Sequence, residues 1–336
     1  MSRVPAVEVL LATYNGARFL REQLDSVFAQ DYENVRVLAR DDGSSDQTNE
    51  ILAQYARRFP ERMRIMPTGF MTGSAKKNFG FLMQASTADY ICFCDQDDVW
   101  LPDKLSAAKH AMDQLESRWS TNTPLLVFSD LRVVDDQLQT LHPSFWSHMG
   151  IDPGQVGRLA TVLVQSVVTG CTAMVNRKLI ELACHMPEEA FMHDRWIALL
   201  IACFGRAGFV RSPTVLYRQH GENVLGTGRK VAANSAENPA RPLLERILKP
   251  HVSTGLLAYW EMSQREAKAL LAVHGPELPP QKANILLAFL RCQTSKSGWL
   301  RVVTFLRYRF FYPDMRTNLA IAAYLWRRNV LNASQG

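Results

Sequence analysis

Three carboxylates, Asp95, Asp97 and Asp98, follow directly after the apolar run of residues 90–94. Like charges crowded at the end of a buried strand repel one another, and each of them also loses hydration. A fold tolerates this crowding where a cation binds. Because residues i and i+2 of a strand project from the same face, Asp95 and Asp97 can point the same way on either side of Gln96. Two hard oxygen ligands side by side suit Mg²⁺ or Mn²⁺ that holds a diphosphate.

A solvated acidic turn that caps the helix beginning near Pro102 is the structural alternative for these carboxylates. An isolated Asp-x-Asp pattern is short, and by itself it favours that alternative. Here the pattern ends a strongly apolar strand, and polar turns at 13–16 and 40–43 follow two other apolar runs. The position in the chain therefore favours a metal and diphosphate site.

The two polar turns are themselves candidates for ligand binding. Residues 13–16 come after the run at 7–12, and residues 40–43 come after the run at 35–39. The second turn contains Asp-Asp-Gly, which can be an ordinary turn with Asx hydrogen bonds, but a carboxylate there can also accept from a base N–H. Together the turns predict a nucleotide pocket. The side chains placed to contact the base and the ribose are Thr13, Tyr14, Asn15, Asp41 and Asp42.

Further candidates lie later in the chain. His193 and Asp194 begin an apolar helix, where Asp194 predicts an N-cap favoured by the helix dipole. A carboxylate at a helix start that is aimed into a cleft is also suited to be a general base. His220, in "YRQHGEN", is by itself more typical of a surface or packing histidine than of a ligand, and Arg218 beside it could serve phosphate.

The elements that must position these residues follow from the apolar spacing. Strands are predicted at 7–12, 35–39, 62–67 and 89–94, with amphipathic helices between them, one at 74–86. This order predicts an α/β fold with a mostly parallel sheet flanked by helices. In such sheets ligands bind beyond the carboxyl ends of the strands. We therefore expect the polar clusters to meet in one nucleotide-binding crevice.

Beyond residue 124 the pattern changes. We expect two strands around a turn at 124–141, a strand at 167–176 followed by a helix, and a helix at 191–205. Residues 208–226 predict two short strands and a loop.

The chain predicts three parts. Residues 1–225 form the α/β domain, and residues 226–242, rich in Gly, Pro, Asn and Ala, form a flexible linker or lid. Residues 243–336 form a helical C-terminal region that is rich in basic and aromatic residues.

The net charge of +6 lies in the C-terminal region, because residues 296–336 hold seven basic residues and one acidic residue. An apolar stripe there predicts either a helix that packs on the catalytic domain or a helix that lies on an anionic membrane surface. Nucleic acid would be attracted by the same charge, but nothing in the α/β part calls for it, and no nucleic-acid partner is expected. The stripe consists of Leu319, Ala322, Ala323, Trp326 and Val330.

The six cysteines form no CxxC motif and no zinc-spaced cluster, which is typical of a reducing cytosol. The first residues lack the layout of a signal peptide, and no stretch is a convincing membrane span. We therefore expect a cytoplasmic protein.

Three stretches carry a resemblance to a known family: "VLLATYNGARFLREQLDSVFAQDYENVRVLARDDGSSDQT", "CDQDDVWLPDKL" and "MHDRWIALL". They resemble family 2 of the inverting nucleotide-sugar glycosyltransferases, which have the GT-A fold. The version is most similar to bacterial rhamnosyltransferases that act on surface polysaccharide or lipopolysaccharide. The resemblance covers about the first two-thirds of the chain.

The resemblance implies a role for each matching residue. The two polar turns would line the base and ribose, Asp95 and Asp97 would hold the metal and diphosphate, and Asp194 would act as the catalytic base. His220 sits where some GT-A enzymes supply a third metal ligand. The donor-binding residues would be Thr13, Tyr14, Asn15, Asp41, Asp42, Asp95, Gln96 and Arg218.

Two departures from the family pattern matter. The base motif has His-Asp where many members have Glu-Asp, and the Gln-x-x-Arg-Trp motif of processive synthases is missing. The second departure favours transfer of a single sugar. The expected activity is metal-dependent inverting transfer, with dTDP-rhamnose as the first candidate donor and a saccharide or lipid-linked acceptor. The enzyme would work on the inner face of a bacterial inner membrane.

Two other classes of function stay open at this point. A nucleotidyltransferase could use a similar sheet, but the Gly-rich phosphate loop expected after the first strand is missing from "ATYNGA". A non-catalytic, membrane-associated module that binds sugar nucleotides is the other alternative. The intact Asp95, Asp97 and Asp194 count against it.

Overall fold

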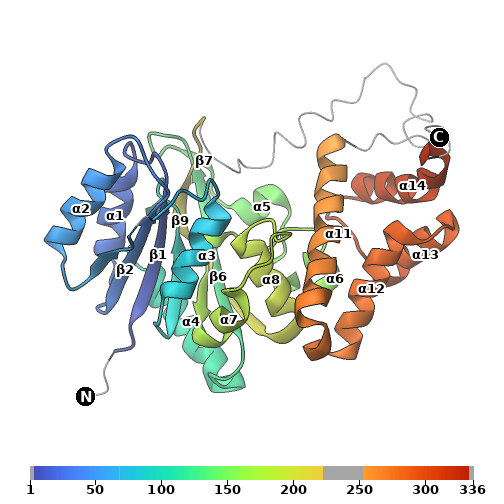
Figure 1. Ribbon diagram of the computed structural model, residues 1–336, viewed down its shortest axis with the longest axis horizontal. Helices are drawn as coiled ribbons and strands as arrows, with labels where there is room; N and C mark the ends of the chain where they lie inside the picture. Colours follow the sequence, from blue (N-terminus) through green and yellow to red (C-terminus); the bar gives the residue numbers. More distant parts are fainter. Residues whose placement is uncertain (1–3, 68, 222–252, 333–336) are drawn as a thin grey trace. The chain divides into compact units, whose positions relative to one another are not determined.

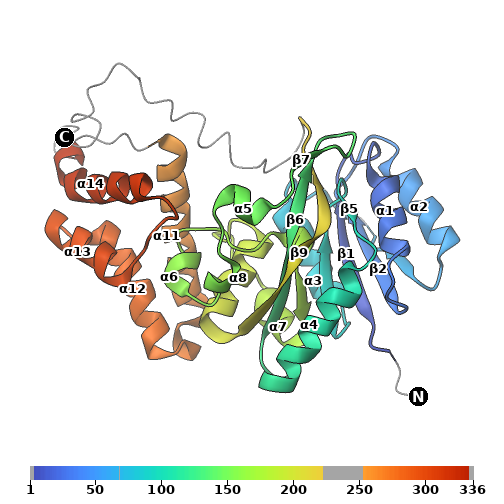
Figure 2. The same cartoon turned by 180° about the vertical axis from the view of Figure 1, so that it is seen from behind.

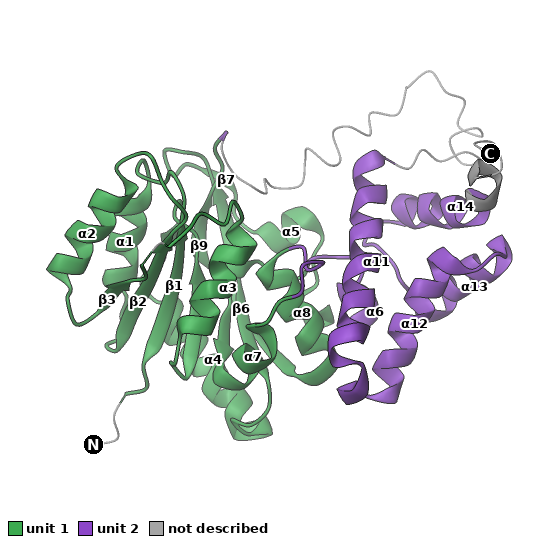
Figure 3. Ribbon diagram, in the orientation of Figure 1, with its two compact units in different colours: residues 1–157, 167–186, 192–220 green, residues 158–166, 187–191, 221–336 purple. Residues whose placement is uncertain are grey.

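The computed structural model describes residues 4–67, 69–221 and 253–332. The chain divides into two compact units, shown in Figure 3. Unit 1 consists of Met1–Gly157, Val167–Met186 and Met192–His220, and unit 2 of Arg158–Ser166, Pro187–Phe191 and Gly221–Gly336. The linker or lid predicted at 226–242 lies outside the described residues.

Unit 1 is built on one nine-stranded sheet with the order β3-β2-β1-β4-β8-β6-β9-β5, and β7 pairs with β6 (Figure 1). This is the predicted α/β fold, and the strands at the amino-terminal end lie where the apolar runs place them. The strands are β1 (Val7–Thr13), β2 (Val35–Asp41), β3 (Met63–Ile65), β4 (Tyr90–Cys94), β5 (Val99–Trp100), β6 (Leu125–Val134), β7 (Thr140–His142), β8 (Met174–Asn176) and β9 (Arg206–Arg218).

Helices cover both faces of the sheet. Helix α3 lies on the face seen in Figure 1, and α4 lies on the opposite face, seen in Figure 2. The helices of unit 1 are α1 (Leu20–Phe28), α2 (Thr48–Arg58), α3 (Ala75–Ala85), α4 (Lys104–Trp119), α5 (Phe145–Met149), α7 (Arg177–Ala183) and α8 (His193–Phe204), with 3₁₀ turns η1 (Pro153–Gln155) and η2 (Gly170–Thr172).

Strand direction brings the predicted site residues to one edge. Strands β1, β2, β3 and β4 are parallel to one another. Strand β8 is antiparallel to both β4 and β6, and β9 is parallel to β6, so β6 and β9 run in the same direction as β4. In register, Thr13 lies beside Asp41, and Leu11 lies beside Cys94. The carboxyl ends of β1, β2, β4 and β9 therefore share one edge of the sheet, as expected for a ligand-binding edge.

Two expected elements differ from the structure. Residues 206–218 form one strand instead of two, because a register shift opposite Ser129 and Asp130 accommodates Pro213, which has no N–H to donate. The strand expected at 167–176 is reduced to β8, because η2 turns the chain just before it.

Unit 2 is helical, as predicted for the C-terminal region, and its helices are α6 (Leu159–Val162), α11 (Thr254–His274), α12 (Pro280–Thr294), α13 (Gly298–Tyr308) and α14 (Met315–Asn332), with the 3₁₀ turn η3 (Gly275–Glu277). Its core is a cluster of buried rings in which Trp260 lies 4.8 Å from Phe289 and Phe289 lies 5.0 Å from Phe310 between centroids. None of the described helices is both long enough and apolar enough to span a bilayer.

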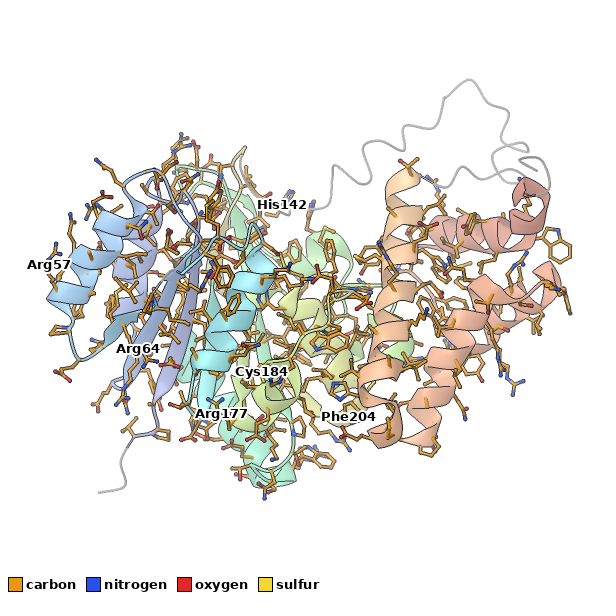
Figure 4. All side chains as sticks on the ribbon, viewed as in Figure 1. Arg57, Arg64, His142, Arg177, Cys184 and Phe204 are labelled. Carbon is orange, nitrogen blue, oxygen red and sulfur yellow. The ribbon has the colours of Figure 1, made fainter. Side chains whose placement is uncertain are left out.

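The cysteines are all free thiols, and five of the six are buried. Cys184, labelled in Figure 4, is half-buried. Cys92 and Cys94 pack in the sheet core among apolar side chains, as expected for reduced thiols.

Candidate active site

The loop after β1 and the turn after β2 are tied together by hydrogen bonds between backbone and side chains. The Asn15 amide donates to Ser44 Oγ at 2.8 Å, the Ser45 amide donates to Asn15 Oδ1 at 2.9 Å, and the Gly16 amide donates to Thr48 Oγ1 at 2.9 Å. Asn15 has a positive φ of 48°, which asparagine tolerates better than most residues. The structure therefore brings the two predicted nucleotide loops into direct contact.

Asp41 and Asp42 are both buried, and their oxygens already accept hydrogen bonds from the protein. An ionised carboxylate offers about four acceptor positions. The donors to Asp41 are Thr13 Oγ1 (2.9 Å), the Gly43 and Ser44 amides (3.0 and 2.8 Å), Ser44 Oγ (2.5 Å) and Asn49 Nδ2 (3.0 Å). The donors to Asp42 are Arg40 Nη1 (3.0 Å), the Thr72 amide and hydroxyl (2.7 and 2.9 Å) and the Gly73 amide (2.8 Å).

The electrostatics of Asp42 match this arrangement. Burial opposes its charged form, but the hydrogen bonds from Thr72, Arg40 and Gly73 outweigh burial and lower its pKa. In this structure both carboxylates are bonded to protein donors, and a base N–H would have to replace one of these donors to reach them. Thr72, in the loop after β3, was missed by sequence reasoning, because a lone Thr-Gly pair gives no distinctive signal.

Gln96 links the first loop to the acidic turn. Its Oε1 accepts from the Tyr14 amide at 2.8 Å, and its Nε2 donates to the Tyr14 carbonyl at 2.9 Å. A Cβ on Gly16 would lie 2.3 Å from Gln96 Oε1, so this close approach requires glycine. Only the backbone of Tyr14 makes these bonds, and the residue is 52% exposed, so its ring can stack on a planar ligand.

The acidic turn concentrates negative charge. Burial raises the pKa of Asp95 to about 7, and the nearby charges of Asp97 and Asp194 add to the rise. Burial also raises the pKa of Asp98 well above its ordinary value, with Asp97 and Asp95 as further causes. The helix α4 begins after Asp103, and no side chain caps it. These carboxylates therefore do not cap that helix.

Asp97 is held by the end of β9. Its Oδ2 lies 2.8 Å from His220 Nε2, and its carbonyl accepts from Arg218 Nε at 2.8 Å. The Arg218 amide donates to Asp98 Oδ1 at 3.1 Å. Arg218 Nη1 donates to the Asp136 carbonyl at 2.6 Å, and Nη2 contacts Glu22 Oε2. All three guanidinium nitrogens thus engage protein oxygens, and the predicted contact with phosphate would require one of these bonds to be exchanged.

The residues present suit a hard divalent cation. Asp95 and Asp98 have raised pKa values although buried Lys104 contributes a positive charge near Asp98, and no described residue donates a hydrogen bond of ordinary geometry to the buried Asp98 Oδ2. Among the described residues, one group of possible ligand atoms lies within 4.8 Å, from Asp95, Asp98 and Cys171. It differs from the predicted set of Asp95, Asp97 and His220.

Cys171 was not predicted and is the weaker ligand of that group. Burial raises the pKa of its thiol well above 9.0, so the thiolate that binds metals is disfavoured. Mg²⁺ and Mn²⁺ also prefer oxygen ligands to sulfur. Carboxylates of the acidic turn, with His220, therefore fit such a cation better than a set that depends on Cys171.

Asp194 lies in the first turn of α8 and is half-buried. It is not the N-cap that the sequence predicts, because Met192 holds that position and no side chain caps the helix. Its Oδ2 accepts from the Gly170 amide at 3.0 Å, and its Oδ1 accepts from the Arg195 amide at 2.7 Å. The Gly170 amide thus fixes one oxygen of this carboxylate, and the charge of Asp194 contributes to the raised pKa of Asp95.

Gly170 and His193 set the position of Asp194. A Cβ on Gly170 would lie 2.6 Å from His193 Nε2, so only glycine fits beside this ring. The ring centroid of His193 lies 4.0 Å from that of Phe79 and 4.8 Å from that of Phe93. Neither of its ring nitrogens has a hydrogen-bond partner among the described residues. Burial lowers the pKa of His193 from 6.5 to about 4.

We expect His193→Phe to make the protein less sensitive to acid. The unfolded chain binds a proton on His193 below pH 6.5, whereas the folded protein binds it only near pH 4. Stability is therefore fully present above pH 6.5 and falls as the pH drops towards 4, by about 3 kcal/mol for this group. Phenylalanine has a similar shape but does not titrate, so the variant should not show this decrease in stability. Urea unfolding at several pH values measures the free energy of unfolding of both proteins.

His110→Gln is the control for this prediction, because His110 is exposed and should leave the pH slope unchanged. Equal slopes for the wild type and His193→Phe between pH 6.5 and 4 would contradict the assignment.

The architecture is that of an α/β protein whose candidate site residues meet at the carboxyl edge of a sheet. The family model described as "Glycosyl transferase family 2" matches residues 8–182, which is more than half of the chain. The chain therefore belongs to glycosyl transferase family 2, and the protein is a glycosyltransferase.

Individual relatives agree with this assignment. The chain is 29% identical over 227 residues to the dTDP-rhamnosyl transferase RfbG of Shigella flexneri, which covers 64% of this chain and 73% of that protein. It is 24% identical over 226 residues to an uncharacterized glycosyltransferase of Nostoc sp., covering 65% of this chain and 66% of that one.

Solved structures confirm the fold. The crystal structure of S. aureus TarS 1-349 in complex with UDP-GlcNAc aligns with a TM-score of 0.57 at 13% identity, covering 97% of this chain and 92% of that chain. At this level of identity the similarity concerns the fold alone, and it supports the GT-A type expected from the sequence.

Proposed function

We propose that this glycosyltransferase moves one sugar, with inversion, from a nucleotide diphosphate donor to a saccharide or lipid-linked acceptor of the bacterial surface. One observation carries the proposal: Asp95 at the end of β4 and Asp194 at the start of α8 lie close enough that the charge of Asp194 helps raise the pKa of Asp95. In this proposal the diphosphate site and the general base would be near each other.

In the proposed reaction, Asp194 removes the proton from an acceptor hydroxyl. The acceptor oxygen then forms a bond to the anomeric carbon while the bond from that carbon to the diphosphate oxygen breaks. The nucleoside diphosphate leaves with the electron pair, and the configuration inverts because there is one displacement. The Gly170 and Arg195 amides orient the carboxylate for this step.

The donor would lie across the loops after β1 and β2. Thr13, Asn15 and the buried Asp41 and Asp42 fix the shape of the base and ribose pocket, with the exposed ring of Tyr14 stacking on the base. Gln96 holds this loop against the acidic turn.

Asp95 and Asp97, with His220 as a third ligand, would hold Mg²⁺ or Mn²⁺. Such an ion neutralises charge on a departing diphosphate and orients its oxygens. The hydrogen bond from His220 Nε2 to Asp97 Oδ2 keeps both candidate ligands at the same edge of the sheet. Asp98 supports this group through the Arg218 amide.

Arg218 would position these ligands. We expect Arg218→Lys to weaken Mn²⁺ activation by about tenfold or more, because lysine cannot make all three contacts by which the guanidinium joins Asp97 to Asp136 and Glu22. The effect should fall on the Mn²⁺ concentration required for activity more than on the rate at saturating Mn²⁺. Mn²⁺ titration of sugar transfer measures it.

Glu22→Gln is the matched control for Arg218→Lys, since it removes the ion pair with a half-exposed partner but leaves the two carbonyl contacts of Arg218. It should change Mn²⁺ activation much less. An Arg218→Lys enzyme with wild-type Mn²⁺ dependence would show that Arg218 has no positioning role.

The first candidate donor is dTDP-rhamnose, supported by the identity to the rhamnosyl transferase of Shigella flexneri. We further propose that residues 1–225 carry the reaction, that 226–242 link or cover it, and that the C-terminal region holds the enzyme at the inner face of a bacterial inner membrane. Thermal protection and hydrolysis with a panel of nucleotide sugars tests the donor. Protection by none of them would reject the proposal, and nucleotide-dependent release of pyrophosphate would indicate a nucleotidyltransferase instead.

A further inference from the structure

Helix α14 has two apolar sides. Its buried side contains Ile321 and Leu325, one turn apart. Residues Met315, Leu319 and Trp326 are 72%, 54% and 55% exposed, and their spacing of i, i+4 and i+11 places them on one other stripe. Leu319 and Trp326 of the stripe identified in the sequence therefore lie on the exposed side of this helix, whereas Ile321 and Leu325 pack inside unit 2.

Helix α13 repeats this arrangement. Arg301, Thr304 and Phe305 are its buried residues, whereas Trp299 and Leu306 are 66% and 50% exposed. Residues seven apart lie on the same side of a helix. A helix that packs by one side only would place polar residues at these positions.

The two exposed stripes meet at a pair of tryptophans. The ring centroids of Trp299 and Trp326 are 6.4 Å apart, in an edge-to-face arrangement. A Cβ on Gly298 would lie 2.5 Å from the Trp326 carbonyl oxygen, so glycine allows α13 to approach α14 closely at this point. Figures 1 and 2 show the two helices as neighbours. We call Trp299, Leu306, Met315, Leu319 and Trp326 the apolar face.

The exposed charges on these helices are mainly positive. Asp314 is the single acidic residue between 296 and 327. Arg301, one of the seven basic residues of 296–336, is only 1% exposed, and it donates to the Leu325 carbonyl at 2.6 Å. It fixes α13 to α14 and is not available to a partner. The exposed basic residues are Lys296, Arg307, Arg309, Arg316 and Arg327.

We propose that the apolar face binds the headgroup region of an anionic lipid bilayer, with the surrounding arginines against the lipid phosphates. This inference rests on the proposed function as a membrane-surface enzyme and names the residues that make the contact. Aromatic rings beside basic residues suit the headgroup region of a bilayer, because tryptophan has an apolar body and a polar N–H.

Charge favours lipid over two other occupants of this face. Residues 222–252 carry five basic and three acidic residues, so their net charge has the same sign as the face. A second copy of the chain would bring its own arginines against these ones. Both arrangements place like charges together, whereas an anionic surface neutralises them.

The test is flotation of the full-length protein with vesicles of phosphatidylcholine alone or mixed with phosphatidylglycerol. We expect binding to the anionic vesicles that weakens at high salt. The double variant Trp299→Gln and Trp326→Gln should lower the partition coefficient about tenfold or more at both salt concentrations. Arg316→Gln and Arg327→Gln should each lower it about fivefold, and at low salt only.

Leu287→Gln and Lys268→Gln are the matched controls, because both residues are exposed on other helices of unit 2. They should leave flotation unchanged. Equal flotation of the tryptophan variant and the wild type would overturn the proposal, as would an equal loss in the controls. A smaller molecular mass of the tryptophan variant in light scattering would assign the face to a second copy. Donor protection is measured separately, so a failure of flotation leaves the sugar-transfer proposal standing.

Discussion

The Asp194→Asn enzyme should bind its donor normally and lose about 10³-fold in kcat. Asparagine keeps the size of the side chain and one oxygen for the Gly170 amide, but it cannot accept a proton from an acceptor hydroxyl. Because donor binding uses the loops after β1 and β2, it should not change. Donor affinity by thermal protection and single-turnover transfer separate these two quantities.

Stability is the main confounding factor for Asp194→Asn. The residue lies in the first turn of α8, where loss of a negative charge weakens the interaction with the helix dipole by about 0.3–1 kcal/mol. Glu50→Gln is the matched control, since Glu50 is the exposed acidic residue in the first turn of α2. It should share the small stability effect and retain transfer. An Asp194→Asn enzyme with a rate near that of the wild type would show that Asp194 is not the general base and only stabilises the start of α8.

Periodicity predicted the sheet because the strands at the amino-terminal end are buried on both sides. Val7, Val9, Leu10 and Leu11 of β1 are all 0% exposed, so the strand is a largely apolar run interrupted only by Glu8. The polar turns after such runs are then placed at the carboxyl edge by topology alone. This reasoning was sufficient to bring Thr13, Asp41 and Asp95 to one edge of the sheet.

The partners of each polar side chain were beyond sequence reasoning. Arg218 is a conventional phosphate candidate by type, yet its guanidinium binds the Asp97 and Asp136 carbonyls, because β9 ends beside the acidic turn. Sequence spacing does not encode that distance across the sheet. Asp194 likewise resembles an N-cap, although its strongest long-range partner is Gly170, from a turn that the apolar pattern predicted as strand.

The direction in which an apolar stripe faces was also beyond the sequence. On α14 the residues at 319 and 326 and those at 321 and 325 both repeat at helical spacing, and only the fold decides that the second set is buried. The sequence likewise did not indicate which basic residues are exposed. Arg301 lies in a basic segment, yet it is buried and joins α13 to α14.

Asp97→Asn should lower kcat by about 10²–10³-fold while the protein stays folded. The carboxylate is one of two predicted oxygen ligands from the acidic turn, and its neutral replacement can keep the contact with His220 but carries no charge for a divalent cation. The wild type should lose activity in EDTA and regain it with Mn²⁺. Asp113→Asn, which removes an exposed carboxylate on α4, is the matched control and should behave as the wild type.

Cys171→Ala decides between the two possible sets of ligands. If Asp95 and Asp97 with His220 hold the ion, removal of the buried thiol should leave the Mn²⁺ requirement unchanged, and Asp97→Asn alone should raise the Mn²⁺ concentration needed. If Asp95 and Asp98 with Cys171 hold the ion, Cys171→Ala should raise the Mn²⁺ concentration needed, and Asp97→Asn should leave it unchanged. Wild-type activity that persists in EDTA, together with an active Asp97→Asn enzyme, would mean that the carboxylates crowd together for a reason other than a metal.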